Sequence, residues 1–407
     1  MCGQNVRPCI APTAMSLEAP IVLSSGRHIN NLVLTGADLV NKNIVLNGGT
    51  DSGKSYIIKY LMLLMREYID QIIVVCPTET MTSSYEEHVS PLLVHYELAL
   101  NDEGPAPSAP PGKKNKKDGD SVAEIRNKGK RFFDAVWRRQ EALVLTYRKV
   151  NKLDVLASLY ELIKTPETDK YLVTAYHDMR RAKEKLGMMY RGDEVMYKNE
   201  VKKLTKKLGE VYVLIYKRFI TPKAAELWNM PLSKKQRFTL THIHLNPRLL
   251  MILDDCAAEL KPYATLPELR KFFYQNRHSM TTFIITAQSC TDLHPNFRTN
   301  AFITFFTEEG DASNYFENSK NGITKSEKRD AVEAMSKIFH GPRWRKMVYM
   351  RIDKTGQKLY SFTAPTVPPF TFGSRALRAL CNELKTSDDD DADDSNPYSA
   401  MLSNVTG

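Results

Sequence analysis

The stretch from Asn43 to Leu61, "NIVLNGGTDSGKSYIIKYL", limits the possible folds of this chain more than any other feature. It matches G-x-x-x-x-G-K-[ST], a pattern in which glycines let backbone N–H groups surround a phosphate. A short apolar run precedes the glycines and a helical pattern follows them. Strand, glycine-rich loop and helix open a parallel α/β sheet, and the positive end of that helix faces the anion. The stretch therefore predicts a phosphate-binding loop.

The residues of this loop have separate expected roles. Lys54 would reach the β- and γ-phosphates, and the Ser55 hydroxyl would ligate Mg²⁺. The carboxylate of Asp51 opposes phosphate binding if it points inward, and the sequence offers no reason for its presence. The expected nucleotide-binding residues are Gly48, Gly49, Thr50, Asp51, Ser52, Gly53, Lys54, Ser55 and Tyr56.

Composition narrows the class of protein. The chain has 407 residues, enough for about two domains, and 42% of them are hydrophobic. It has no apolar run of about 18 residues and no secretory leader pattern, so neither a membrane span nor secretion is expected. Its six cysteines form no CxxC pair, which is typical of a reduced cytosolic or nuclear protein. The net charge of +10 suggests a polyanionic partner such as nucleic acid, although a solvated basic face fits equally well.

The remaining patterns predict a discontinuous α/β core with a mainly parallel sheet. Apolar runs that end in polar residues, such as "PRLLMILDD", indicate strands buried on both faces. The expected parts are a leader at 1–42, with a possible strand at "NNLVLTG"; a P-loop core at 43–100 and 236–365; a basic, mostly helical insertion at 101–235, with a Pro/Lys-rich loop at 101–120; and an acidic tail at 366–407, expected to be disordered. Within the insertion, Pro166 and Gly192 separate the expected helices.

Polar side chains end two of the later strands. A P-loop enzyme needs a carboxylate at the end of a neighbouring strand to hold Mg²⁺, largely through water, and Asp254 fits that place. Asp255 would then orient or deprotonate the attacking water. Gln288 ends the strand "MTTFIITAQ", where an amide beside the γ-phosphate can sense it or position water. Each alone is an ordinary strand end, but after a well-formed loop we interpret them as one site.

An arginine from a neighbouring subunit is the remaining expected part, because charge spreads over the γ-phosphoryl oxygens in the transition state. Arg277, before the Gln288 strand, and Arg298, in "NFRTN" after it, are the candidates; a surface arginine is the alternative for each. A zinc site is not favoured. His242 and His244 share a face if "THIHLNP" is a strand, but no Cys or carboxylate set completes the ligands.

The ordered set "NGGTDSGKS", "IIVVCPTE", "LMILDDC" and "FFYQNRHSMTTFIITAQSCTDLHPNFRTN" resembles the poxvirus-type genome-packaging ATPases of large DNA viruses, within the FtsK–HerA superfamily of P-loop ATPases. The resemblance covers residues 43–100 and 238–310, under half of the chain. It implies a RecA-like ATPase core that hydrolyses ATP with Mg²⁺ and threads double-stranded DNA into a capsid. The implied catalytic residues are Lys54, Asp255, Gln288 and, as the trans finger, Arg277; the implied Mg²⁺ contacts are Ser55 and Asp254.

The same resemblance implies where and with what the protein works. Its partners would be double-stranded DNA, a capsid or procapsid vertex protein, and further copies of itself in a hexameric or pentameric ring. It would be found in the virion and in the infected host cell, in a cytoplasmic viral factory or the nucleus. Two features depart from the superfamily: members outside the viral branch usually have Glu where this chain has Asp255, and the 101–235 insertion is longer than usual.

Three other functions remain open at this point. One is a DNA-dependent P-loop ATPase without a packaging role, such as a helicase-like protein or a regulator that binds DNA. Another is a nucleotide kinase, although such enzymes are usually compact and need no basic surplus. The third is a non-enzymatic virion scaffold with a degenerate loop, which the intact Lys54, Ser55, Asp254 and Asp255 disfavour.

Overall fold

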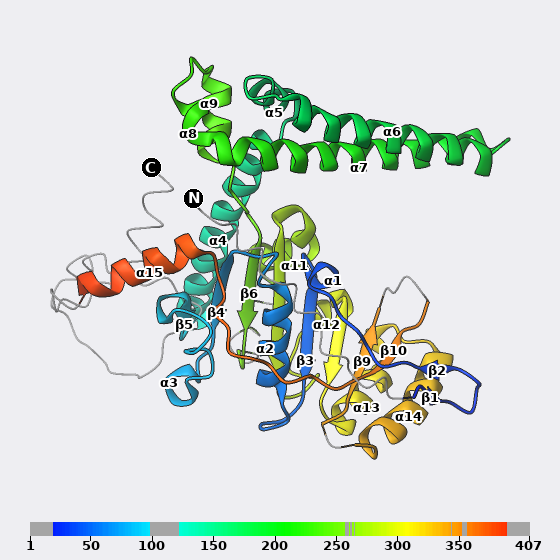
Figure 1. Cartoon of the computed structure of the whole chain (residues 1–407). Coiled ribbons are helices and arrows are strands. Elements are labelled where there is room, and N and C mark those ends of the chain that lie inside the picture. Colours follow the sequence, from blue (N-terminus) through cyan, green and yellow to red (C-terminus); the bar gives the residue numbers. More distant parts are fainter. Residues whose placement is uncertain are drawn as a thin grey trace. The chain divides into compact units, whose positions relative to one another are not determined.

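Figure 1 shows the computed structural model of the chain. It describes residues 19–97, 122–256, 260, 263, 265–342, 344–351 and 356–388. The chain forms two compact units, one of Met1–Gln140 with Pro247–Gly407 and the other of Glu141–Asn246. The predicted Pro/Lys-rich loop at 101–120 and the acidic run of the tail lie outside the described residues.

An eight-stranded sheet lies at the centre of the first unit, with strand order β10-β9-β8-β3-β7-β6-β4-β5. The strands are β3 (Asn43–Asn47), β4 (Gln71–Val75), β5 (Val94–His95), β6 (Leu249–Leu253), β7 (Thr281–Ala287), β8 (Ile303–Phe306), β9 (Lys346–Met350) and β10 (Leu359–Phe362). β9 is antiparallel to both of its neighbours, and the other neighbouring pairs are parallel. The predicted α/β fold with a mainly parallel sheet, interrupted by a helical insertion, is confirmed.

Helices cover both faces of this sheet (Figure 1). Side chains alternate along a strand, so Ile44 and Leu46 of β3 pack on one face and Val45 on the other. The first face is covered by α1 (Gly36–Leu39) and α2 (Lys54–Met65), and the second by α11 (Pro267–Ser279), α12 (Pro295–Asn300) and the first half of α4 (Val122–Val150). Every residue of β3, β6 and β7 is consequently buried, and the central residues of each strand are apolar.

Smaller elements complete the first unit. They are β1 (Ile21–Val22), β2 (His28–Ile29), α3 (Glu79–Thr82), α13 (Glu309–Glu317), α14 (Lys325–Phe339), α15 (Arg375–Asp388) and the 3₁₀ turns η1 (Pro91–Leu93) and η4 (Ser319–Asn321). Phe306, Tyr315 and Phe316 centre a third apolar cluster, between α13, α14 and the strands β8 and β9.

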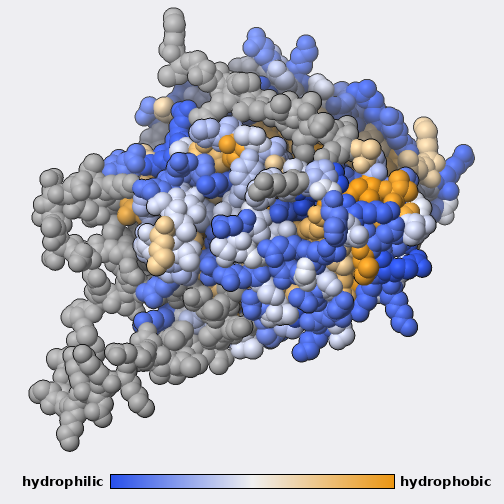
Figure 2. All heavy atoms as spheres, turned by 90° about the horizontal axis from the view of Figure 1, so that it is seen from below, coloured by the Kyte–Doolittle hydropathy of each residue, from blue (hydrophilic) through white to orange (hydrophobic). Residues whose placement is uncertain are grey.

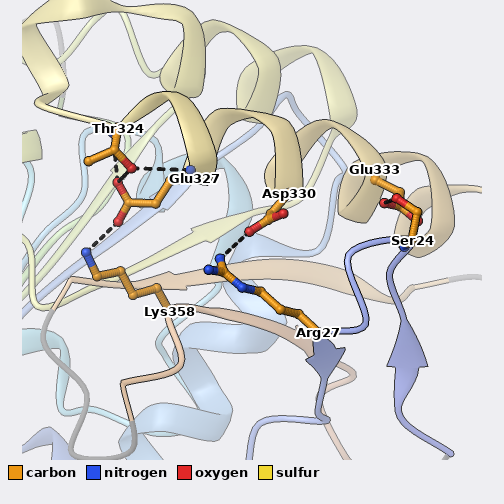
Figure 3. A network of polar contacts seen from close by, with 7 residues as sticks. All are labelled: Ser24, Arg27, Thr324, Glu327, Asp330, Glu333 and Lys358. Carbon is orange, nitrogen blue, oxygen red and sulfur yellow. Dashed lines mark hydrogen bonds and ion pairs between the residues drawn. The ribbon is translucent and has the colours of Figure 1, made fainter.

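A polar network fastens the N-terminal hairpin β1–β2 to α14 (Figure 3). Ser24 donates from its backbone N–H and its Oγ to the two carboxylate oxygens of Glu333, over 2.7 and 2.6 Å. Two ion pairs complete the network: Arg27–Asp330 and Lys358–Glu327. The contacts of Ser24 and Arg27 with α14 join residues 309 and 303 positions apart, so they hold tertiary structure rather than a single helix.

The segment at 363–374, which we call the strap, differs from the predicted disorder beyond residue 365. Its Phe370 and Phe372 are buried in the core beside α2. The N–H of Phe372 donates to the carbonyl of His88 over 2.8 Å, and α15 follows directly. The acidic composition of the tail suggested a solvated chain, but these aromatic side chains supply the apolar burial that orders its first part.

Two predicted strands are absent from the described part of the chain. In "NNLVLTG", only Asn31 forms an isolated bridge, to Ser361, while Leu32 and Leu34 are buried from a loop. In "THIHLNP", His242 ends a helix and the residues after it form a turn. Among the described residues no group of three or more His, Cys, Asp or Glu could hold a metal ion.

The second unit is helical throughout. After the end of α4 it contains α5 (Leu153–Tyr160), α6 (Pro166–Met189), α7 (Glu194–Ile220), η2 (Thr221–Lys223), α8 (Ala224–Trp228) and α9 (Lys234–Thr241). As predicted, a helix begins at Pro166, where Thr165 caps it, and Gly192 lies in the turn before α7. Six buried residues form its core: Leu156, Leu159, Ile220, Leu227, Leu240 and Ile243. No residue of α6 is buried.

The insertion has different bounds from the expected 101–235. The first half of α4 belongs to the first unit, because Phe132, Phe133 and Val136 pack onto the sheet. α9, which was expected in the core, belongs to the second unit. The chain leaves and re-enters the core at adjacent points, where the Gln140 side chain donates to the carbonyl of Pro247. None of the helices in the described ranges is long and apolar enough to cross a membrane.

The surface in Figure 2 is mostly hydrophilic, with hydrophobic side chains gathered toward one side of that face. This distribution is ordinary for a protein of this composition.

Candidate active site

The loop between β3 and α2 has the backbone of a phosphate-binding loop. Gly48 (φ 148°) lies so close to Thr307 that a Cβ would be 1.6 Å from its Oγ1, so only glycine fits. Gly53 (φ 91°) caps the start of α2 in a left-handed conformation that favours glycine. Lys54 Nζ donates to the carbonyls of Gly48 and Gly49 over 2.6 and 2.5 Å. The ammonium thus spans the loop with two of its three N–H groups and keeps one for a phosphate oxygen.

The same loop explains Asp51. Its backbone is left-handed, with φ 58°, and its side chain is exposed. Among non-glycine residues, Asp and Asn tolerate this conformation best. The backbone therefore accounts for an aspartate here without any contact to phosphate.

Asp254 follows β6 and is buried, with both carboxylate oxygens bonded. Thr286 Oγ1 donates to its Oδ1 and the Tyr85 hydroxyl to its Oδ2, each over 2.7 Å. Burial raises the pKa of Asp254, and these two hydrogen bonds oppose the rise because they favour the ionised form. The pair of donors fixes the direction in which the carboxylate points.

Asp255 and Gln288 meet beside it. Gln288 Nε2 donates to Asp255 Oδ1 over 3.1 Å, and the N–H of Asp255 donates to Thr286 Oγ1 over 2.8 Å. Thr286 therefore links the two acids. Asp255 has a left-handed backbone (φ 54°), which Asp adopts more readily than Glu, and this is a physical reason for Asp at this position.

Strand order brings these residues to one edge of the sheet. The acid was expected at the end of a strand next to the loop strand, but β7 lies between β3 and β6. Gln288 follows this intervening strand. The loop, both acids and Gln288 line one cavity of about 770 Å³. Burial lowers the pKa of Lys54, while the nearby Asp254 and Asp255 carboxylates oppose that fall.

Two residues that the motifs did not indicate brace the loop from its other side. Lys346, buried at the start of β9, donates from Nζ to the carbonyl of Ser52 over 2.7 Å and to that of Thr307 over 3.3 Å. Glu308 accepts from the N–H of Gly49 over 2.9 Å. Burial lowers the pKa of Lys346, and the Glu308 carboxylate opposes the fall.

The two candidate arginines lie away from this cavity. Arg277 is exposed at the end of α11, just before β7, whereas Gln288 just follows β7. A strand of this length places Arg277 and Gln288 about 20 Å apart, at opposite ends of β7. Arg298 in α12 is only 4% exposed. Neither arginine is among the residues that line the cavity, and of the two only Arg277 is exposed.

The donor set at this edge fits Mg²⁺. The Ser55 hydroxyl and the Asp254 carboxylate line the same cavity, and both present oxygen. Mg²⁺ usually takes one or two protein oxygens and completes its shell with water and substrate phosphates, so a dense cluster of acids is not required. Bound there, it would neutralise charge on the phosphates.

Comparisons with known proteins give close relatives of unknown function. No protein-family model matches the chain. The uncharacterized protein B354L of African swine fever virus (isolate Pig/Kenya/KEN-50/1950) is 35% identical over 384 residues, which are 94% of this chain and 98% of that protein. The uncharacterized protein 075L of Invertebrate iridescent virus 6 is 32% identical over 97 residues, 23% of this chain and 37% of that protein.

Solved structures are more distant. The genome packaging NTPase B204 from Sulfolobus turreted icosahedral virus 2, in complex with ATP-gammaS, is 13% identical, with a TM-score of 0.31 over 79% of this chain and 95% of that chain. The plasmid coupling protein TrwB, in complex with a GTP analogue, is 13% identical, with a TM-score of 0.33 over 88% of this chain and 92% of that chain.

Proposed function

The chain belongs to the family of the African swine fever virus protein B354L, and we propose that it is an ATP-hydrolysing DNA translocase that packages double-stranded viral genome into the capsid. The single observation that carries the ATPase is the convergence of Lys54, Asp254, Asp255 and Gln288 on one cavity at the carboxyl edge of a parallel sheet. That edge is where α/β proteins bind their ligands.

The proposed hydrolysis divides among these side chains. The loop N–H groups, the start of α2 and Lys54 hold the triphosphate, and Ser55 with Asp254 holds Mg²⁺. Asp255 accepts the proton of the attacking water, because its carboxylate lines the cavity and Gln288 fixes one of its oxygens. The other oxygen is left to face the water.

The proposed DNA contact rests on charge. The second unit, Glu141–Asn246, carries 21 Lys and Arg residues against 12 Asp and Glu, so it holds nearly all of the surplus in a chain of net charge +10. Phosphate neutralisation by such residues supplies sequence-independent affinity, which a motor that moves along DNA requires. The resemblance to packaging ATPases supports the proposal that the energy of ATP hydrolysis drives movement along DNA.

We further propose a ring of copies of this chain, with Arg277 as the trans finger, docked on a capsid or procapsid vertex protein. The packaging role implies that the protein is found in the virion and in the infected cell, in a viral factory or the nucleus. The occurrence of relatives in African swine fever virus and an iridescent virus supports a viral setting.

The test is the ATPase rate of the full chain with and without long double-stranded DNA, over a range of salt. A translocase is stimulated by DNA, and the stimulation falls steeply as salt rises. Lys54→Ala abolishes turnover and serves as the baseline. An ATPase rate that does not change with DNA would contradict both the translocase and the other DNA-dependent functions. Transfer of phosphate to a nucleotide rather than to water would identify a kinase.

A further inference from the structure

The cavity lining extends beyond the phosphate-binding loop and the acids to Trp344, Thr363 and Ala364, and it includes Tyr56 next to the loop. Thr363 and Ala364 belong to the strap, and Trp344 lies two residues before β9. None of them is part of the motifs that identified the loop, apart from Tyr56.

Trp344 is unusual for a side chain of its size. It is 53% exposed, and its backbone is left-handed, with φ 72°. A bulky residue rarely adopts this conformation, and such strain gathers at ligand sites. The indole also lies beside the phosphate-binding loop, because a Cβ added at Gly53 would be 3.9 Å from its Cε3.

The strap lines the same cavity and is held there by Tyr56. The Tyr56 hydroxyl donates to the carbonyl of Pro365 over 3.1 Å and accepts from the N–H of Val367 over 3.2 Å. Tyr56 follows Ser55 on α2, so the helix that opens at the phosphate site also fixes this wall. Thr363 and Ala364 thereby become part of the lining.

We propose that Trp344 and the strap line a nucleobase subsite in this cavity, in which the base stacks on the indole of Trp344 and the strap supplies another wall. The inference rests on the proposed function, since it assumes that a nucleoside triphosphate occupies the loop. An exposed indole offers a flat apolar face, and bases stack on such faces largely without regard to base identity. ATP and GTP therefore share the subsite.

The experiment separates the base from the phosphates. Equilibrium binding of ATP and of inorganic tripolyphosphate, each with Mg²⁺, is measured on the full chain and on three variants: Trp344→Ala, Trp344→Phe and, as a matched exposed tryptophan in the other unit, Trp228→Ala. Trp344→Ala weakens ATP binding by about 5- to 100-fold and changes tripolyphosphate binding by less than about twofold. Trp344→Phe restores most of the affinity, and Trp228→Ala changes neither.

Fluorescence gives a second readout, because the chain has only three tryptophans. ATP quenches the emission of the wild-type chain and of Trp228→Ala, but not of Trp344→Phe, whereas tripolyphosphate quenches none of them. Unchanged ATP affinity in Trp344→Ala overturns the subsite while the ATPase stands. Equal weakening of ATP and tripolyphosphate shows that Trp344 shapes the loop instead, and also overturns it. A wild-type chain that binds neither ligand overturns the proposed function itself.

Discussion

The sheet unit and the helical insertion differ in the burial and in the bonding partners of their polar side chains. In the sheet unit Asp254, Lys346 and Thr286 are buried and bonded to groups far away in the sequence. In the insertion most ion pairs join residues three or four apart, such as Arg180–Glu184, whose side chains are both exposed. Buried groups are fixed in direction, whereas exposed pairs are weak and mobile. The first arrangement suits chemistry and the second suits adaptable contact with a polyanion.

Removal of the Asp255 carboxylate should give the largest effect and tests the chemical half of this comparison. Asp255→Asn keeps the left-handed backbone and the cavity but removes the proton acceptor, so ATP turnover falls about 100- to 10,000-fold while ATP binding persists. Phosphate release and equilibrium binding measure the two. Lys206→Gln in the insertion is the control and leaves DNA-free turnover unchanged. Normal turnover in Asp255→Asn would remove this residue from the mechanism.

Core truncations in the two units test whether they unfold separately. Phe283 on β7 is buried, and its ring centroid lies 5.6 Å from that of Phe272. Phe283→Ala therefore lowers the free energy of unfolding of the sheet unit by about 3–5 kcal/mol, and ATP binding is lost in the same unfolding transition. Leu159→Ala, in the small apolar core of the insertion, lowers the free energy of unfolding of the insertion by about 2–5 kcal/mol and leaves that of the sheet unit unchanged. Denaturant unfolding is followed by circular dichroism and by ATP binding. If Leu159→Ala also lowers the midpoint for ATP binding, the units fold as one body.

The same contrast explains what the sequence could predict. Lys54, Asp254, Asp255 and Gln288 were identifiable because strand ends of a parallel sheet meet at one edge, whatever the order of the strands. Their geometry and their catalytic and ligand roles are separate matters, and the roles stay predictions.

Other features depended on strand order or on backbone conformation. Lys346 reaches the loop only because β9 lies two strands from β3, and no local pattern at Lys346 indicates this. Tyr85 lies in an irregular segment and reaches Asp254 across 169 positions. The strap was missed because the composition of the tail outweighed two phenylalanines. The roles of Asp51 and Asp255 in left-handed turns are visible only in the backbone.

Charge removal on α7 tests the binding half of the comparison and should have a smaller effect. Lys202, Lys206 and Lys207 are exposed on this helix. Replacing all three with Gln lowers the slope of log affinity for duplex DNA against log salt by about 3, one for each lost phosphate contact. Fluorescence anisotropy over a salt series measures the slope. Thr205→Ala on the same stretch is the control. A slope that does not change would place the DNA contact elsewhere.

Acid should loosen the N-terminal hairpin before it affects the insertion, and this is the smallest effect expected. Hydrogen bonds from Lys337 and Ser24 lower the pKa of Glu333 to about 2, from 4.5. Because the folded pKa lies below the unfolded one, the stabilisation is fully present above about pH 4.5 and is lost as the pH falls toward 2. Glu333→Gln removes this dependence, so its melting temperature falls less steeply between pH 5 and pH 3 than that of the wild type. Glu184→Gln in the insertion keeps the wild-type slope, since the partner of Glu184 in the described structure is an exposed arginine of its own helix. Parallel curves for all three proteins would mean that the hairpin contacts in Figure 3 contribute no more than a surface pair.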